Sequence, residues 1–233
     1  MSTRLTGISS MATRQVLAEL AAAYRQQSGA DVASEVVFES VGGVDAAKRV
    51  QAGEQFDVVV LAADAIDKLV ASGRVIADSK ADLVRSKVAI AVRAGAPRPD
   101  IGSEESLRRA VLSARTLGYS TGPSGTALLK LFARWGIADT IRDRVVQAPP
   151  GVPVGQLVAR GEVELGFQQF SEMASQPGIA VLGTMPPGTE IISIFSAGLC
   201  AASNQPEAVR ALLAFMQSPA AADTKRRHGM EPA

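Results

Sequence analysis

Residues 57–72 read DVVVLAADAIDKLVAS, and this stretch indicates the fold class. Its first five residues, Asp57–Leu61, are nearly all β-branched or aliphatic, which is typical of a strand that is covered on both faces. Ala62–Ser72 follows directly and is predicted as a helix. A buried strand that leads into a helix is the unit from which parallel sheets with right-handed crossovers are built. The stretch therefore predicts an α/β protein.

The alternation of strand and helix continues on both sides of this stretch. Further strands are predicted at Leu5–Ile8, Val36–Phe38, Val88–Val92, Thr116–Tyr119 and Glu164–Phe167. Further helices are predicted at Thr13–Gln27, Asp45–Gln51, Ser103–Ala114, Thr126–Trp135, Gln156–Arg160, Pro206–Met216 and Ala220–His228. We expect two lobes, each a mainly parallel sheet flanked by helices, with a ligand cleft between them. Residues 1–84 and 195–233 form the first predicted lobe and 85–194 the second, so that the chain crosses twice.

The composition argues against several classes of partner. The 233 residues include 24 Lys and Arg against 23 Asp and Glu, a net charge of +1, and aromatic residues make up 4%. This balance gives no electrostatic reason to expect nucleic acid, and base-stacking surfaces are not expected either. No stretch approaches the roughly 18 apolar residues of a membrane span, so no membrane insertion is expected. With one histidine and one cysteine, the chain is expected to hold no metal and no cofactor.

The beginning of the sequence leaves the compartment open. Residues 1–8, MSTRLTGI, contain no apolar signal region and no small-residue cleavage site. We therefore expect either a cytoplasmic protein or a periplasmic one whose signal peptide has been removed.

Three predicted strand-to-helix loops share one chemistry. They contain Ser9 and Ser10, then Gly42 and Gly43, and finally the segment 120–125, which contributes Ser120, Thr121, Ser124 and Gly125. Hydroxyls, glycines and the free N–H groups at helix starts together form an anion site, because the helix dipole favours negative charge there. In open α/β sheets the ligand lies beyond the carboxyl ends of the strands. These loops are therefore the candidate ligand-binding residues.

Several segments resemble one known family. They are Ser9-Ser10, residues 46–53 with 57–60, Pro123-Ser124-Gly125, residues 181–184 and the tail 218–233. All of these are similar to segments of the molybdate-binding periplasmic proteins, the substrate-binding components of anion ABC transporters. The resemblance covers nearly the whole chain. It implies a type 2 periplasmic-binding fold, binding of a small oxyanion or carboxylate, and, if the protein is exported, an ABC permease as partner.

Two departures from that family concern the ligand. The family's second loop is usually rich in serine where this chain has Gly42 and Gly43, and its ligand-binding tyrosine corresponds to Gln168 or Gln169. Amides offer both donors and acceptors and suit a carboxylate at least as well as a tetrahedral oxyanion. Val154, just before a predicted short helix, completes the candidate ligand-binding set.

An enzymatic alternative follows from the same resemblance. Aconitate isomerase, which interconverts the cis and trans forms of an unsaturated tricarboxylate, also resembles this family. That chemistry needs an acid or base at an allylic carbon and donors for the carboxylates. The candidates to move a proton are Glu39 and Asp45, and Arg85 and Lys87 are the candidate cations. The sequence leaves both interpretations open, with anion binding as the main prediction and isomerisation as the alternative.

Overall fold

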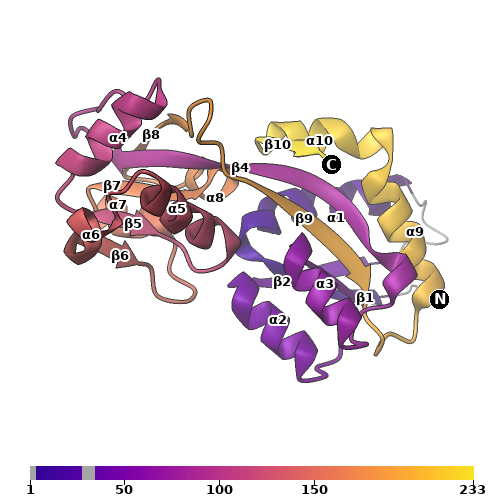
Figure 1. Cartoon of the computed structure of the whole chain (residues 1–233). Coiled ribbons are helices and arrows are strands. Elements are labelled where there is room, and N and C mark those ends of the chain that lie inside the picture. Colours follow the sequence, from indigo (N-terminus) through magenta and orange to yellow (C-terminus); the bar gives the residue numbers. More distant parts are fainter. Residues whose placement is uncertain (1–3, 28–34) are drawn as a thin grey trace. The chain divides into compact units, whose positions relative to one another are not determined.

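The computed structural model describes residues 4–27 and 35–233 as a mixed α/β chain that divides into two compact units (Figure 1). Residues 1–85 and 194–233 belong to the first unit, and residues 86–193 belong to the second. The chain passes from one unit to the other twice, once within strand β4 (Ala81–Arg93) and once within strand β9 (Ile192–Leu199). These boundaries differ by one residue from those predicted.

Three parallel strands form the centre of the first unit. Strand β1 (Arg4–Ser10) lies between β2 (Glu35–Val41) and β3 (Val58–Ala62) and is parallel to both. Strand β9 continues the sheet antiparallel to β3, and the short β10 (Met230–Pro232) pairs with β4. The parallel register places the carboxyl ends of the three strands at one edge of the sheet.

Helices cover both faces of this sheet. They are α1 (Arg14–Gln27), α2 (Gly43–Gln51), α3 (Ala63–Ala71), α9 (Pro206–Gln217) and α10 (Ala222–Arg227), with 3-10 turns at Met11–Thr13, Ala77–Ser79 and Pro219–Ala221. Val58 and Val60 of β3 pack into one apolar cluster, and Val59 and Leu61 pack into another. The uninterrupted apolar run 58–61 is thus explained, because each face of β3 is buried against a different layer.

The second unit repeats this plan with shorter elements. Strand β5 (Leu117–Tyr119) lies between β6 (Val145–Gln147) and β7 (Leu165–Gln169), and all three are parallel. Strand β4 pairs antiparallel with β7 and with β8 (Ile179–Thr184). The helices are α4 (Glu104–Ser113), α5 (Pro123–Arg134), α6 (Ala138–Ile141), α7 (Val154–Arg160) and α8 (Phe170–Met173), with a 3-10 turn at Arg142–Arg144.

The structure differs from the sequence prediction in several strands and in two four-residue helices. Strand β4 has 13 residues and not the five predicted, and strands β6, β8, β9 and β10 and helices α6 and α8 were not predicted. Helix α5 begins at Pro123, three residues before its predicted start, because Pro is well suited to the first turn of a helix. Among the described residues, no helix has the length and apolar character needed to cross a membrane.

Candidate functional site

The predicted residues of the first unit lie together at the carboxyl edge of its sheet. Ser9 pairs in register with Ser40 on β2, and the two hydroxyl oxygens are 2.8 Å apart. Ser9 is fully buried, and its hydroxyl joins β1 to β2 through Ser40; its predicted role in ligand binding stays a prediction. Ser40, its half-buried partner, was not predicted. The sequence could have indicated Ser40, because it is the one serine in a strand of apolar and glutamate residues.

Ser10 and Gly43 form the accessible part of this edge. Ser10 is half-buried, and its hydroxyl accepts a hydrogen bond from the N–H of Ala12. A Cβ atom on Gly43 would lie 3.5 Å from the Ser10 Oγ, so the start of helix α2 runs directly beside that hydroxyl. Gly42 is the N-cap of α2 and supplies no side-chain cap. The first N–H groups of the helix are therefore available to an acceptor other than the chain's own cap.

The loop after β5 brings the second set of hydroxyls together. The Oγ atoms of Ser120 and Ser124 lie 3.3 Å apart. Gly122, the N-cap of α5, has φ +98°, a conformation that favours glycine. A Cβ atom on Gly125 would lie 2.0 Å from the carbonyl oxygen of Ser120, so only glycine allows the loop to fold back on the helix start. Two hydroxyls and the N–H groups of a 12-residue helix thus converge at this edge, and Thr121 lies half-buried between them.

Val154 and Gln168 have structural roles in this unit. The side chain of Val154 is fully buried and packs against Gly118 and Gly166, so a ligand could be bound only through its backbone. Gln168 is 3% exposed, and its Oε1 accepts a hydrogen bond from the N–H of Gly155 at 3.3 Å. Because that N–H can only donate, the orientation of the amide is defined, and Nε2 faces Glu172 at 2.8 Å. Both ends of the Gln168 amide are therefore used within the unit.

Gln169, the last residue of β7, points to the other face of the strand. Its Nε2 donates to the Oγ of Ser193 at 2.8 Å, while its Oε1 is buried and has no partner among the described residues. An unpaired buried amide oxygen is unfavourable by about 1–3 kcal/mol unless a ligand or water donates to it. Of the two amides, Gln169 is thus the one whose oxygen can still accept a hydrogen bond.

Glu172 is the titratable residue of this edge that the sequence analysis missed. It lies in α8, which begins directly after the carboxyl end of β7, and it is half-buried. Burial raises the pKa of the Glu172 carboxyl to about 7, although the hydrogen bond from Gln168 acts in the opposite direction. A carboxyl group with this pKa accepts and releases protons at neutral pH. Its position four residues after Gln168 is visible in the sequence, but the four-residue helix that positions it was not predicted.

The predicted acid–base pair, Glu39 and Asp45, differs from Glu172 in its surroundings. Glu39 is exposed on β2, and its Oε2 accepts a hydrogen bond from Arg49 Nη2 at 3.0 Å. Hydrogen bonds from Arg49 lower the pKa of Glu39 below its ordinary value, which is unfavourable for a group that must hold a proton. Asp45 is the third residue of helix α2 and is not its N-cap. Neither residue joins the hydroxyl sets described above.

The two predicted cations lie on the same strand. Arg85 and Lys87 are exposed alternate residues of β4, on either side of the boundary at residue 85 between the units. Ser86 between them is fully buried.

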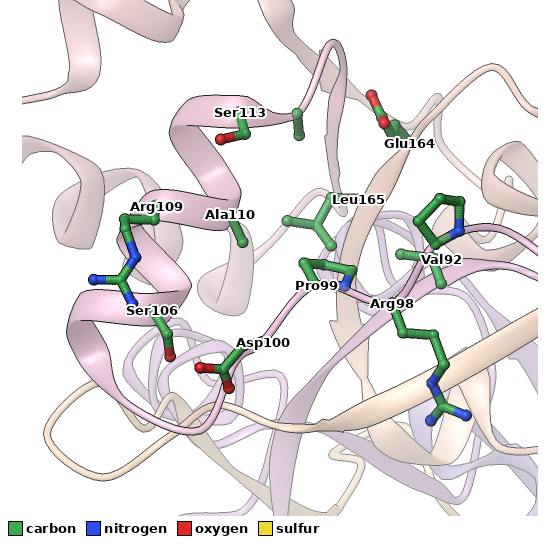
Figure 2. Close-up of a pocket in the computed structure, with 12 residues that line it drawn as sticks. Val92, Arg98, Pro99, Asp100, Ser106, Arg109, Ala110, Ser113, Glu164 and Leu165 are labelled. Carbon is green, nitrogen blue, oxygen red and sulfur yellow. The ribbon is translucent and has the colours of Figure 1, made fainter.

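A cavity of about 370 Å³ lies elsewhere in the second unit (Figure 2). Leu165 and Glu164 line it at the amino end of β7, and Ser106 and Arg109 line it from α4. Since the Ser120 and Ser124 loop follows the carboxyl end of β5, and β5 is parallel to β7, this cavity lies at the opposite edge of the sheet. None of the predicted site residues lines it.

The other reactive side chains in the described part of the chain form neither a metal site nor a reactive thiol. No group of three or more His, Cys, Asp and Glu side chains is placed to hold a metal ion among residues 4–27 and 35–233. Cys200 is buried in an apolar cluster of the first unit. Burial, and then the charge of Asp57, raises the pKa of its thiol to about 12, so it is not a thiolate at neutral pH.

Comparisons with known proteins agree with this architecture. Residues 5–231 match the family model of the bacterial extracellular solute-binding proteins. Among curated proteins, an aconitate isomerase from Pseudomonas sp is 37% identical over 235 residues, covering 99% of this chain and 88% of that protein.

Solved structures give the same fold at lower identity. The periplasmic molybdate-binding protein of Azotobacter vinelandii has a TM-score of 0.78 at 18% identity, covering 97% of this chain and 98% of that chain. The sulfate-binding protein SubI of Mycobacterium tuberculosis H37Rv has a TM-score of 0.80 at 19% identity, with coverage of 99% and 87%. The predicted type 2 periplasmic-binding fold and the predicted family resemblance are confirmed.

Proposed function

The chain belongs to the bacterial extracellular solute-binding protein family, and we propose that it acts as an isomerase that interconverts the cis and trans forms of aconitate or of a closely similar unsaturated polycarboxylate. The family membership supports binding of a small ligand. The proposal adds a reaction to that binding.

The observation that carries the proposal is the identity of 37% with an aconitate isomerase over 99% of this chain. The molybdate- and sulfate-binding proteins share the fold at 18% and 19% identity, and a likeness at that level says nothing of the ligand. The glycines of the second loop and the open amide oxygen of Gln169 at the end of β7 agree with a ligand other than a bare oxyanion.

The reaction itself needs no cofactor. Aconitate carries a CH₂ group and a CH group on either side of a central carbon, each bearing a carboxylate, and the double bond joins the central carbon to the CH. Moving one proton from the CH₂ to the CH shifts the double bond to the other side. The skeleton is then the same, so the product is again aconitate, and the geometry of the new double bond makes it cis or trans. The protein has to bind the carboxylates and transfer one proton.

Hydroxyls and helix-start N–H groups supply the binding part. In the second unit these are Ser120, Ser124 and the first turn of α5, and the first unit has the same chemistry at Ser10 and Gly43. Such groups hold a carboxylate through charge-assisted hydrogen bonds without a buried counter-charge.

The experiment that tests the proposal is approach to equilibrium from both sides. Purified protein is incubated with cis-aconitate in one sample and trans-aconitate in another, and both isomers are separated and quantified over time. We expect the two samples to converge on the same mixture, while protein-free samples stay unchanged. If neither isomer changes, the proposal is wrong.

Reversible anion binding for transport is the second candidate, favoured by the fold shared with periplasmic binding proteins. In this case an ABC permease would be the partner of an exported protein. Thermal unfolding with molybdate, tungstate, sulfate, citrate or the aconitate isomers separates the two candidates, because a ligand at 100 times its Kd adds about 2.7 kcal/mol of stability. Stabilisation by the oxyanions alone, with no isomerisation, would favour the transport function.

A further inference from the structure

We propose that Glu172 is the catalytic residue that removes and returns the proton, and that Gln168 is the positioning residue that holds its carboxyl group. The proposal rests on the isomerase function proposed above and assigns its acid–base chemistry to the second unit. Gln168 was predicted from the sequence as a ligand-binding residue, whereas Glu172 was not predicted.

A defined chain of hydrogen bonds holds the carboxyl group. The N–H of Gly155, in the first turn of α7, donates to Gln168 Oε1 at 3.3 Å, and Gln168 Nε2 donates to Glu172 Oε1 at 2.8 Å. Gln168 itself is fixed in strand β7 and is 3% exposed. The position of the carboxyl group is therefore set by two backbone elements, and a general base needs such a fixed position.

The surroundings of Glu172 are apolar. The cluster around α7, α8 and β8 consists mainly of aliphatic side chains, among them Val154, Val158, Met173 and Val181. Strands β7 and β8 contain no charged residue, and the charged residue of α7 is Arg160, at its far end, which pairs with Glu162. With no counter-charge on these elements, desolvation raises the pKa of Glu172 to about 7.

Helix α8 and the binding loop both follow carboxyl ends of strands in the same sheet. Helix α8 begins at Phe170, immediately after the carboxyl end of β7, and the Ser120–Ser124 loop follows the carboxyl end of the adjacent strand β5. Gln169, between Gln168 and α8, has a buried amide oxygen without a partner in the described part of the chain. The hydroxyls, the open amide oxygen and the carboxyl group thus belong to one edge of one sheet.

The proposed step balances with no other reactant. The ionised Glu172 takes a proton from the CH₂ carbon, and the electron pair of that C–H bond forms the new double bond to the central carbon. The electron pair of the old double bond moves to the third carbon and is delocalised into its carboxylate. The protonated Glu172 then returns the proton to that carbon, which restores the enzyme.

Glu172→Gln is the first variant for the test, measured for kcat in the isomerisation assay and for aconitate affinity by calorimetry. We expect kcat to fall about 10²- to 10⁴-fold while Kd changes less than threefold. The matched control is Glu162→Gln, which makes the same change at an exposed residue of the same unit and should leave kcat unchanged.

The pH profile of kcat/KM gives a readout that a structural role would not move. We expect kcat/KM of the unmodified protein to rise with pH through about 7, because Glu172 must be ionised to act as a base. Gln168→Met removes the hydrogen bond that lowers the pKa of Glu172, so the rising limb should move to higher pH. This variant keeps the proposal testable even if Glu172→Gln folds poorly.

The outcomes distinguish a failure of the role of Glu172 from a failure of the isomerase function. Retention of kcat within threefold in Glu172→Gln, or parallel loss of binding and kcat, would overturn the role of Glu172 but leave the isomerase function intact. If the rising limb of the kcat/KM profile stays at the same pH in Gln168→Met, the role of Glu172 is likewise overturned. Absence of isomerisation by the unmodified protein would overturn both proposals.

Discussion

The carboxyl group of Glu172 lies in an apolar environment, and its raised pKa makes the stability of the protein depend on pH. Because its folded pKa of about 7 lies above the ordinary value of 4.5, the protonated carboxyl contributes stability that is full below pH 4.5 and is lost as the pH rises through about 7. Glutamine cannot ionise, so Glu172→Gln should be more stable than the unmodified protein at pH 8 by roughly 1–3 kcal/mol.

Urea unfolding at pH 4 and pH 8 checks this prediction. The difference between Glu172→Gln and the unmodified protein should be much smaller at pH 4, whereas Glu162→Gln should show no such pH dependence. A difference of the same size at both pH values would mean that the carboxyl group is not desolvated.

Ser124 is the hydroxyl whose contribution to binding can be isolated most cleanly. Its Oγ lies 3.3 Å from that of Ser120, and its side chain is buried at the helix start. A hydrogen bond to a charged group contributes about 1.5–3 kcal/mol, so Ser124→Ala should weaken aconitate binding about tenfold or more. Calorimetric titration measures this. The matched control is Ser113→Ala, at the exposed end of α4, which should bind as the unmodified protein does; equal affinity for Ser124→Ala would remove that hydroxyl from the site.

Cys200 is predicted to be dispensable for activity. Its thiol is buried and has a raised pKa, so it is neither accessible nor ionised at neutral pH. Cys200→Ala should keep kcat and KM, at a small loss of stability from the smaller side chain. Loss of turnover in a folded Cys200→Ala protein would show that the thiol takes part in the reaction.

At the scale of the secondary-structure elements, the entrance of α5 depends on one glycine. Gly125→Ala would place a Cβ atom 2.0 Å from the Ser120 carbonyl oxygen, so the loop must move. We expect lower thermal stability together with weaker ligand binding. Gly43→Ala, at the start of α2, is the matched control for thermal stability alone, because its Cβ atom would meet only ordinary contacts, the nearest at 3.5 Å. Equal stability of the two variants would show that the close approach at Gly125 is not constraining.

Most helices were predictable from the sequence, whereas several strands and the four-residue helices were not. The strand 58–61 and the helices around it follow from continuous apolar runs and helical spacing, which are strong local signals. Helix α8 has four residues and an N-cap, Gln169, whose side chain makes no capping hydrogen bond, so nothing local marks it. Its formation depends on packing against β7 and β8, and such contacts are absent from the sequence pattern.

The same limit applied to the candidate site. The hydroxyl loops were predicted because serine and glycine at strand ends have a local meaning, and the structure places them at the carboxyl edges of the two sheets. The burial of Ser9 and Val154 and the pairing of Gln168 with Glu172 depend on neighbours far along the chain or on an unpredicted helix. The predicted acid–base candidates were therefore chosen from the visible loops, and Glu172 was missed.

At the scale of the whole molecule, the fold and the ligand chemistry have different support. The fold is shared with anion-binding proteins at TM-scores of 0.78 and 0.80, whereas the identity of 37% is with an isomerase. Under the proposed function, hydroxyls and helix-start N–H groups would bind the carboxylates, and one positioned base would add the reaction. The ligand cleft between the lobes stays a prediction.

The most direct test of the isomerase function is proton NMR of cis-aconitate with the protein in D₂O. We predict that the trans isomer accumulates, because the protein moves one proton from the CH₂ carbon to the CH carbon of aconitate. A spectrum in which cis-aconitate persists unchanged in the presence of folded protein would contradict the account.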